Sequence, residues 1–173
     1  MDALTRIGQA APDFALPDLR GVVHHLSDQR GEILILNFWS AECPWSERAD
    51  QELTLSLVRW QGQVRLWTIA SNANETPQQI QTAAEARDLP VVLLDPNHEV
   101  ADLYGAVTTP HLFLVDPSGS LRYQGAIDDI TFRKRTATQH YLQLAVEALL
   151  AGDQPELAET PPYGCTIVRF GSS

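Results

Sequence analysis

The feature that most constrains the fold is a nearly continuous apolar run, residues 33–38, followed shortly by a Cys43-Pro44 step. A strand formed from this run would be apolar on both faces, as in a central strand covered on each side by helices. This pattern predicts an α/β fold. After the step, apolar side chains recur at spacings of three and four residues, which indicates a helix. These positions are Ala49, Leu53, Leu57 and Trp60.

The rest of the chain alternates strand and helix patterns and ends in a hairpin and a helix, which predicts a mixed central sheet. Further strands are expected at residues 22–26, 64–70, 91–94, 112–115 and 121–124. Further helices are expected after a capping box at Thr76, from Asp95-Pro96 through Leu103, and from Tyr141 to Ala148. We expect a single domain over 1–173, with a core at about 8–152 and a tail at 153–173. The tail is apolar from Tyr163 to Phe170, so it should dock on the domain.

Composition excludes several classes of function. The 173 residues carry a formal net charge of -10, which argues against nucleic acid and anionic membranes as partners. Met1 to Ala11 show no secretory signal, and no apolar run is long enough to span a membrane, so we expect a cytoplasmic protein. Two cysteines are too few for a disulfide scaffold. No metal-site spacing and no haem, flavin or nucleotide motif is present, so no cofactor is expected.

Cys43 is the leading candidate for a reactive group. It lies between the end of the predicted strand and the start of the predicted helix. Pro44 suits the first helical position because it has no N–H to leave unpaired. Free amides and the helix dipole favour an anion there. Such positions lower a cysteine pKa from about 8.5 to roughly 3.5–7.5. The alternative is an inert buried cysteine, because free cysteine is among the most buried residue types.

Several segments together resemble the thioredoxin-fold redoxins. Residues 38–46 resemble their active-site strand, loop and helix, and 108–111 resemble the loop that carries a cis-proline facing the thiol. Residues 8–16 resemble an N-terminal extension of peroxiredoxin-like and TlpA-like proteins, and 164–167 resemble a C-terminal glycine–cysteine element of the AhpC/TSA group. The resemblance covers about 8–170 and implies a thioredoxin-like fold with thiol-based redox chemistry.

The resemblance also implies the roles of individual residues. Cys43 would be the nucleophile, and the hydroxyls of Ser40 and Ser46 would stabilise its thiolate. Trp45 would line the approach to the thiol, although core packing is the alternative. Pro110 would be cis, the alternative being an ordinary loop proline. The residues of the implied substrate face are Pro44, Trp45, Thr109 and Pro110.

The chain also departs from these relatives. Ser46 stands where thioredoxins have their second cysteine, so the helix motif alone cannot form a disulfide. Asn37 stands where thioredoxins have a buried carboxylate. Against peroxiredoxins, Leu36 replaces a proline, and Pro110 aligns with the arginine that polarises peroxide. Arg122 could supply that charge, but no sequence feature places it near the thiol.

Cys165 has two interpretations, a packed apolar residue in the docked tail or a resolving thiol for Cys43. The function therefore has three candidates. The first is an oxidoreductase acting on disulfides or hydroperoxides and regenerated by Cys165 or by an external thiol reductant such as a thioredoxin. The second is a peroxiredoxin-like thiol peroxidase. The third is a non-catalytic redox sensor or thiol-binding module. No oligomeric state is predicted.

Overall fold

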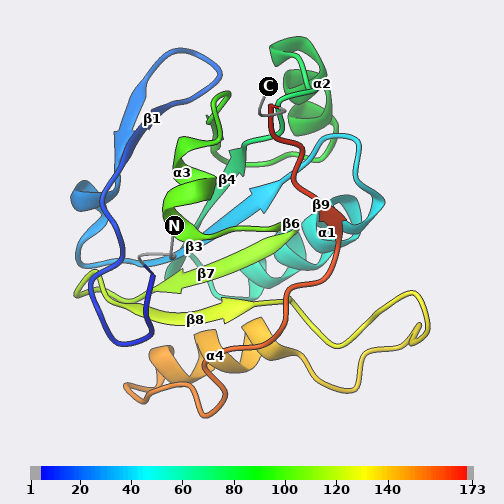
Figure 1. The fold of residues 1–173 in the computed structure, drawn as a ribbon. Coiled ribbons are helices and arrows are strands. Elements are labelled where there is room, and N and C mark those ends of the chain that lie inside the picture. The colour runs from blue at the N-terminus through cyan, green and yellow to red at the C-terminus, as the bar shows by residue number, and fades with distance from the viewer. Residues whose placement is uncertain (1–4, 171–173) are drawn as a thin grey trace.

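A mixed five-stranded sheet forms the centre of the molecule (Figure 1). The computed structural model describes residues 5–170, so the ends of the predicted domain and tail, 1–4 and 171–173, lie outside the described residues. The strand order is β5-β4-β3-β7-β8, with β3, β4 and β5 parallel and the hairpin β7–β8 antiparallel. The strands are β3 (Ile33–Trp39), β4 (Val64–Ala70), β5 (Val92–Leu94), β7 (His111–Val115) and β8 (Leu121–Gly125). All seven residues of β3 are buried, as its composition predicts.

Helices cover both faces of this sheet. Leu53 of α1 (Pro44–Arg59) and Val146 of α4 (Tyr141–Leu150) pack on one face. Ile80 of α2 (Pro77–Ala86) packs against Trp39 at the carboxyl end of β3. The other face is covered by α3 (Glu99–Tyr104) and by the N-terminal segment that carries Phe14. This arrangement confirms the predicted α/β class.

Two details at the edges of the fold differ from the sequence prediction. The predicted strand 22–26 is shorter, because β2 (Val23–His25) pairs with β1 (Ala15–Pro17) and a 3-10 turn η1 (Leu26–Gln29) follows at once. The helix predicted from Asp95-Pro96 begins only at Glu99. His98, just before it, has a left-handed backbone with φ 48°, which a helix cannot continue through.

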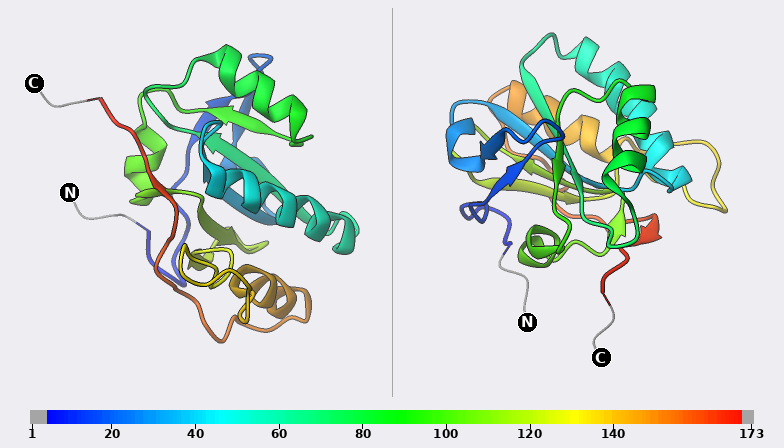
Figure 2. Two further views of the ribbon diagram at one scale, coloured as in Figure 1. Left: turned by 90° about the vertical axis from the view of Figure 1, so that its right-hand side faces the viewer. Right: turned by 90° about the horizontal axis from the view of Figure 1, so that it is seen from above.

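The C-terminal tail docks on the domain, as its apolar sequence predicts. It crosses the sheet end near α1 (Figures 1 and 2) and forms β9 (Cys165–Thr166). This strand pairs antiparallel with β6 (Thr108–Thr109), so that Cys165 lies opposite Thr109. Ile167 follows in the core, 3% exposed. Within 5–170, no helix has the length and apolar character needed to cross a bilayer.

Candidate active site

Cys43 is the N-cap residue of α1, and Pro44 is at the start of the helix, as predicted. The Cys43 carbonyl accepts the N–H of Glu47 at 3.1 Å, which begins the helical hydrogen bonding. Cys43 is only 3% exposed. Cys165 of the docked tail is one of the residues that bury it, and Cys165 is itself only half-buried.

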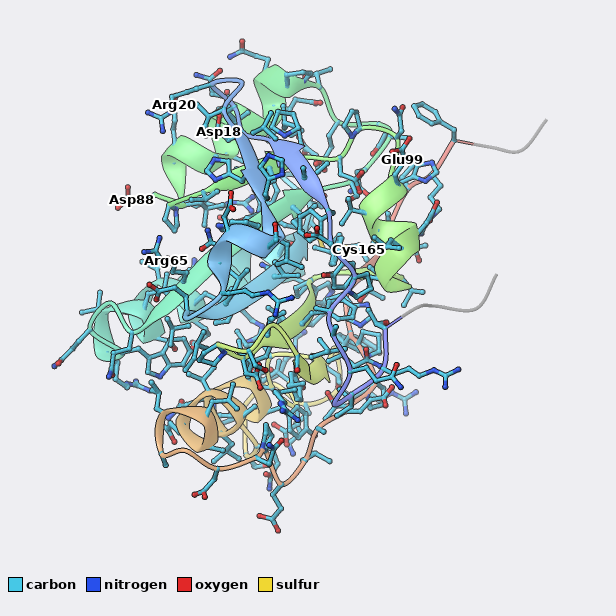
Figure 3. All side chains as sticks on the ribbon, turned by 90° about the vertical axis from the view of Figure 1, so that its left-hand side faces the viewer. Asp18, Arg20, Arg65, Asp88, Glu99 and Cys165 are labelled. Atoms are coloured by element: carbon cyan, nitrogen blue, oxygen red, sulfur yellow. The ribbon has the colours of Figure 1, made fainter. Side chains whose placement is uncertain are left out.

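The two cysteines meet although they are far apart in the sequence. Their Sγ atoms lie 2.6 Å apart, and the Cys43 thiol also lies 3.1 Å from the carbonyl oxygen of Thr109. The Thr109–Pro110 peptide bond is cis, as predicted. In Figure 3, Cys165 lies well inside the outline of the molecule, whereas Arg65 is at its rim. The fold brings together four of the predicted site residues, Cys43, Cys165, Thr109 and Pro110.

The two thiols differ in acidity. Burial raises the pKa of Cys43, but hydrogen bonds from the Cys165 thiol and backbone and from the Ser46 backbone N–H, with the Thr109 side chain, outweigh it, so the pKa is lowered overall. Burial, together with the hydrogen bond and charge of Cys43, raises the pKa of Cys165 to about 12. Cys43 is therefore the thiol that ionises first.

The two serines do not act on the sulfur as the sequence suggested. The hydroxyl of Ser40 donates to the carboxylate of Glu75, which corrects its expected place beside the thiolate. The hydroxyl oxygen of Ser46 accepts the N–H of Ser40 at 3.2 Å. Ser46 stabilises the Cys43 thiolate through its backbone N–H, a donor that any residue except proline provides at this position.

Glu75 fixes the loop that leads into Cys43, and sequence analysis missed it. Its carboxylate accepts the N–H of Ala41 at 3.0 Å and that of Glu42 at 3.3 Å, in addition to the Ser40 hydroxyl. Asn72 also donates to it at 3.4 Å. The parallel register of β3 and β4 could have indicated this contact, because it brings the segments that follow both strands to the same sheet edge.

A buried charged group supports the same loop from behind. Asp50 in α1 is 2% exposed and accepts the Trp39 indole N–H at 2.7 Å and an Arg87 N–H at 3.1 Å. Arg87 donates also to the carbonyl of Ala41 at 2.7 Å. Burial raises the pKa of Asp50 to about 6, against the lowering effect of both hydrogen bonds.

Trp45 lies beside the thiol on α1, but the tail covers its ring. The Trp45 and Tyr163 ring centroids are 4.9 Å apart with planes at 86°, an edge-to-face contact. The hydroxyl of Tyr163 accepts the N–H of Phe132 at 2.8 Å. The predicted aromatic approach to Cys43 is therefore occupied by this chain's own C-terminal segment.

Arg122 does not take the place of the peroxiredoxin arginine. Its Nε donates to Asp116 at 2.6 Å, beyond the far end of β7 from Pro110. In the described part of the chain, no group of three His, Cys, Asp or Glu residues is placed to hold a metal ion.

The sheet order, the thiol at the start of α1 and the cis-proline opposite it define a thioredoxin-like protein. Residues 7–124 match the AhpC/TSA family, and the chain belongs to this family. A thiol-disulfide oxidoreductase ResA of Geobacillus thermodenitrificans is 32% identical over 117 residues, covering 67% of each chain.

Solved structures extend the likeness over the tail. A hypothetical protein of Sinorhizobium meliloti 1021 has a TM-score of 0.87 at 28% identity, covering 99% of this chain and 98% of its own. A putative thiol:disulfide interchange protein DsbE of Chlorobium tepidum shares the fold, with a TM-score of 0.67 at 22% identity, covering 86% of this chain and 97% of its own. The family match ends before Cys165, whereas the first of these structures spans it.

Proposed function

We propose that this protein is a thiol–disulfide oxidoreductase in which Cys43 and Cys165 form the redox pair. The observation that carries the proposal is the meeting of their sulfurs, 2.6 Å apart, between a helix N-terminus and a cis-proline loop. The lowered pKa of Cys43 and the raised pKa of Cys165 support an order in which Cys43 attacks first.

In the first step the Cys43 thiolate attacks one sulfur of a substrate disulfide. A mixed disulfide forms, and the other substrate sulfur leaves as a thiolate. Cys165 then loses its proton and attacks the Sγ of Cys43, which releases the second substrate thiolate. The substrate disulfide gains two electrons, and the Cys43–Cys165 dithiol loses them. The raised pKa of Cys165 falls once Cys43 is no longer anionic, because that charge is one of its causes.

An external thiol reductant, such as a thioredoxin, restores the dithiol. Cys165 is the more exposed sulfur, so a reductant thiolate attacks there, and Cys43 leaves. Cys43 is also the better leaving group, because a thiol of lower pKa leaves faster. A second reductant thiol then frees Cys165 and forms the reductant disulfide. A cytoplasmic location, where such thiols are kept reduced, is part of the proposal.

Mild oxidation followed by peptide mass spectrometry tests the pair. We expect a disulfide between the peptides of Cys43 and Cys165, and stoichiometric reduction of insulin disulfides by the reduced protein. Cys165→Ser is the matched control, which should form mixed disulfides at Cys43 without completing the reduction. A stable sulfenate on Cys43 with Cys165 still free would rule out the resolving role.

The other candidates give different results in the same set of assays. Hydrogen peroxide turnover coupled to thioredoxin would indicate a peroxidase. Stable mixed disulfides of the wild-type protein without turnover would indicate a sensor.

A further inference from the structure

We propose that the edge of β6 and the ring of Trp45 form a binding site for an extended cysteine peptide with glycine directly before the cysteine. We further propose that the chain's own residues 163–168, here called the resident strand, occupy this site until a substrate peptide displaces them. The inference rests on the proposed function, because the cysteine of the peptide is the one that exchanges with Cys43.

Backbone pairing aligns the resident strand. Cys165 lies opposite Thr109 in the antiparallel register, which sets its sulfur on that of Cys43. The N–H of Ile167 donates to the carbonyl of Val107 at 3.1 Å and extends the contact. These bonds use main-chain groups, so another extended peptide can form them in the same register.

The position before the cysteine accepts only glycine. A Cβ at Gly164 would lie 2.1 Å from the carbonyl oxygen of Thr109, 2.7 Å from its carbonyl carbon and 3.0 Å from the Cδ of Pro110. The two closest atoms belong to the backbone beside a buried proline, so they cannot turn aside as a flexible side chain would. Steric exclusion at this point selects a Gly-Cys sequence.

Contacts on either side of Gly-Cys hold the strand at both ends. Tyr163 packs edge-to-face on Trp45 before the glycine. Beyond the cysteine, the N–H of Val168 donates to the Asn72 side chain at 2.8 Å, and the carbonyl of Val168 accepts the N–H of Ala73 at 2.8 Å. An aromatic residue two positions before the cysteine should therefore favour binding.

The resident strand must be displaced before a substrate can react, because this strand covers Cys43. Cys43 is 3% exposed, and the Cys165 sulfur is in contact with its sulfur, in the place that a substrate sulfur must take. The β9 pairing covers only two residues, but the bonds of Ile167 and Val168 and the buried Ile167 side chain must also be released when the strand leaves. Tethering to the domain gives the strand a high effective concentration, which favours its return to resolve a mixed disulfide.

The test uses the full-length Cys165→Ser chain, in which Cys43 reacts without being resolved. The probes are two mixed disulfides of thionitrobenzoate, one with the peptide Tyr-Gly-Cys-Thr-Ile and one with Tyr-Ala-Cys-Thr-Ile. Thionitrobenzoate release gives the rate of mixed-disulfide formation. We expect the glycine peptide to react about tenfold faster or more, the size of effect that one added carbon produces in a closely fitted site. Ellman's reagent, which has no strand to pair, measures the accessibility and reactivity of Cys43 without peptide recognition.

A second variant tests displacement. Adding Gly164→Ala to Cys165→Ser should loosen the resident strand, so both peptides react faster while their ratio is kept. Circular dichroism checks that the double variant is folded, and the single variant gives the peptide ratio without it. Equal rates for the two peptides, or no acceleration in the folded double variant, would overturn the inference. If Ellman's reagent still reacts normally, the proposed function survives; an unreactive Cys43 would reject the function itself.

Discussion

At the scale of single residues, the pKa of Cys43 depends on groups from three separate segments. Ser46 belongs to α1, Thr109 to β6 and Cys165 to β9, and their hydrogen bonds together outweigh the burial of the sulfur. Stabilisation of the thiolate therefore requires both the helix start, which the sequence pattern indicates, and a docked tail, which local patterns cannot place.

Cys165→Ala and Cys165→Ser form a matched pair for this dependence. Alanine removes the donor, so we expect the Cys43 pKa to rise in Cys165→Ala relative to Cys165→Ser, whose hydroxyl can still donate. Ultraviolet absorbance of the thiolate, followed against pH, measures both values. Equal values would mean that the Cys165 position does not contribute a hydrogen bond to the thiolate.

Glu75 gives a second prediction at this scale. Glu75→Ala removes the acceptor of two backbone N–H groups and one hydroxyl in the loop before Cys43. We expect the free energy of unfolding to fall by roughly 1–3 kcal/mol. Urea unfolding measures the change. Glu85→Ala is a control, because within residues 5–170 this exposed carboxylate on α2 bonds only to Gln81 one turn away; a loss as large there would contradict the specific role of Glu75.

At the scale of elements, the long strands and helices could be predicted from periodicity, but short pairings could not. Residues 33–38 carry enough apolar positions to specify a covered strand, and the structure confirms it. β6 and β9 have two residues each, too few to show any alternation, and they lie far apart in the chain. The same holds for the site residues. Cys43 and Pro110 could be predicted because they belong to local motifs, whereas Glu75 and Asp50 could not, because they act through tertiary contacts.

Asp50 makes the packing of α1 on the sheet depend on pH. Its pKa is about 6 in the fold, against 3.8 in the free residue, so the native state binds more protons between these values. Stability therefore decreases as pH rises through this window, by up to about 3 kcal/mol. The free energy of unfolding of wild type minus that of Asp50→Asn, from urea titrations at several pH values, should show this decrease. Parallel pH curves for the two proteins would contradict it.

At the scale of the whole molecule, a Cys43–Cys165 bond would close most of the chain into one loop, since the two cysteines are 122 residues apart in the sequence. In the chain-entropy model, closing such a loop stabilises the fold by up to about 5 kcal/mol. We expect the oxidised protein to unfold at clearly higher denaturant concentration than the reduced one. Cys165→Ser should show no such difference, and a similar shift in that variant would point to oxidation elsewhere.

The side chain of Asn72 links the tail to the active-site loop. Its oxygen accepts the N–H of Val168, and its nitrogen donates to Glu75, which holds residues 40–42. The Asn72 amide therefore contacts both the C-terminal segment and the residue that holds the loop before Cys43. If the amide turns as Val168 moves away, the set of donors on Glu75 changes as well. We therefore expect release of the C-terminal strand to change the hydrogen bonds that hold the loop before Cys43.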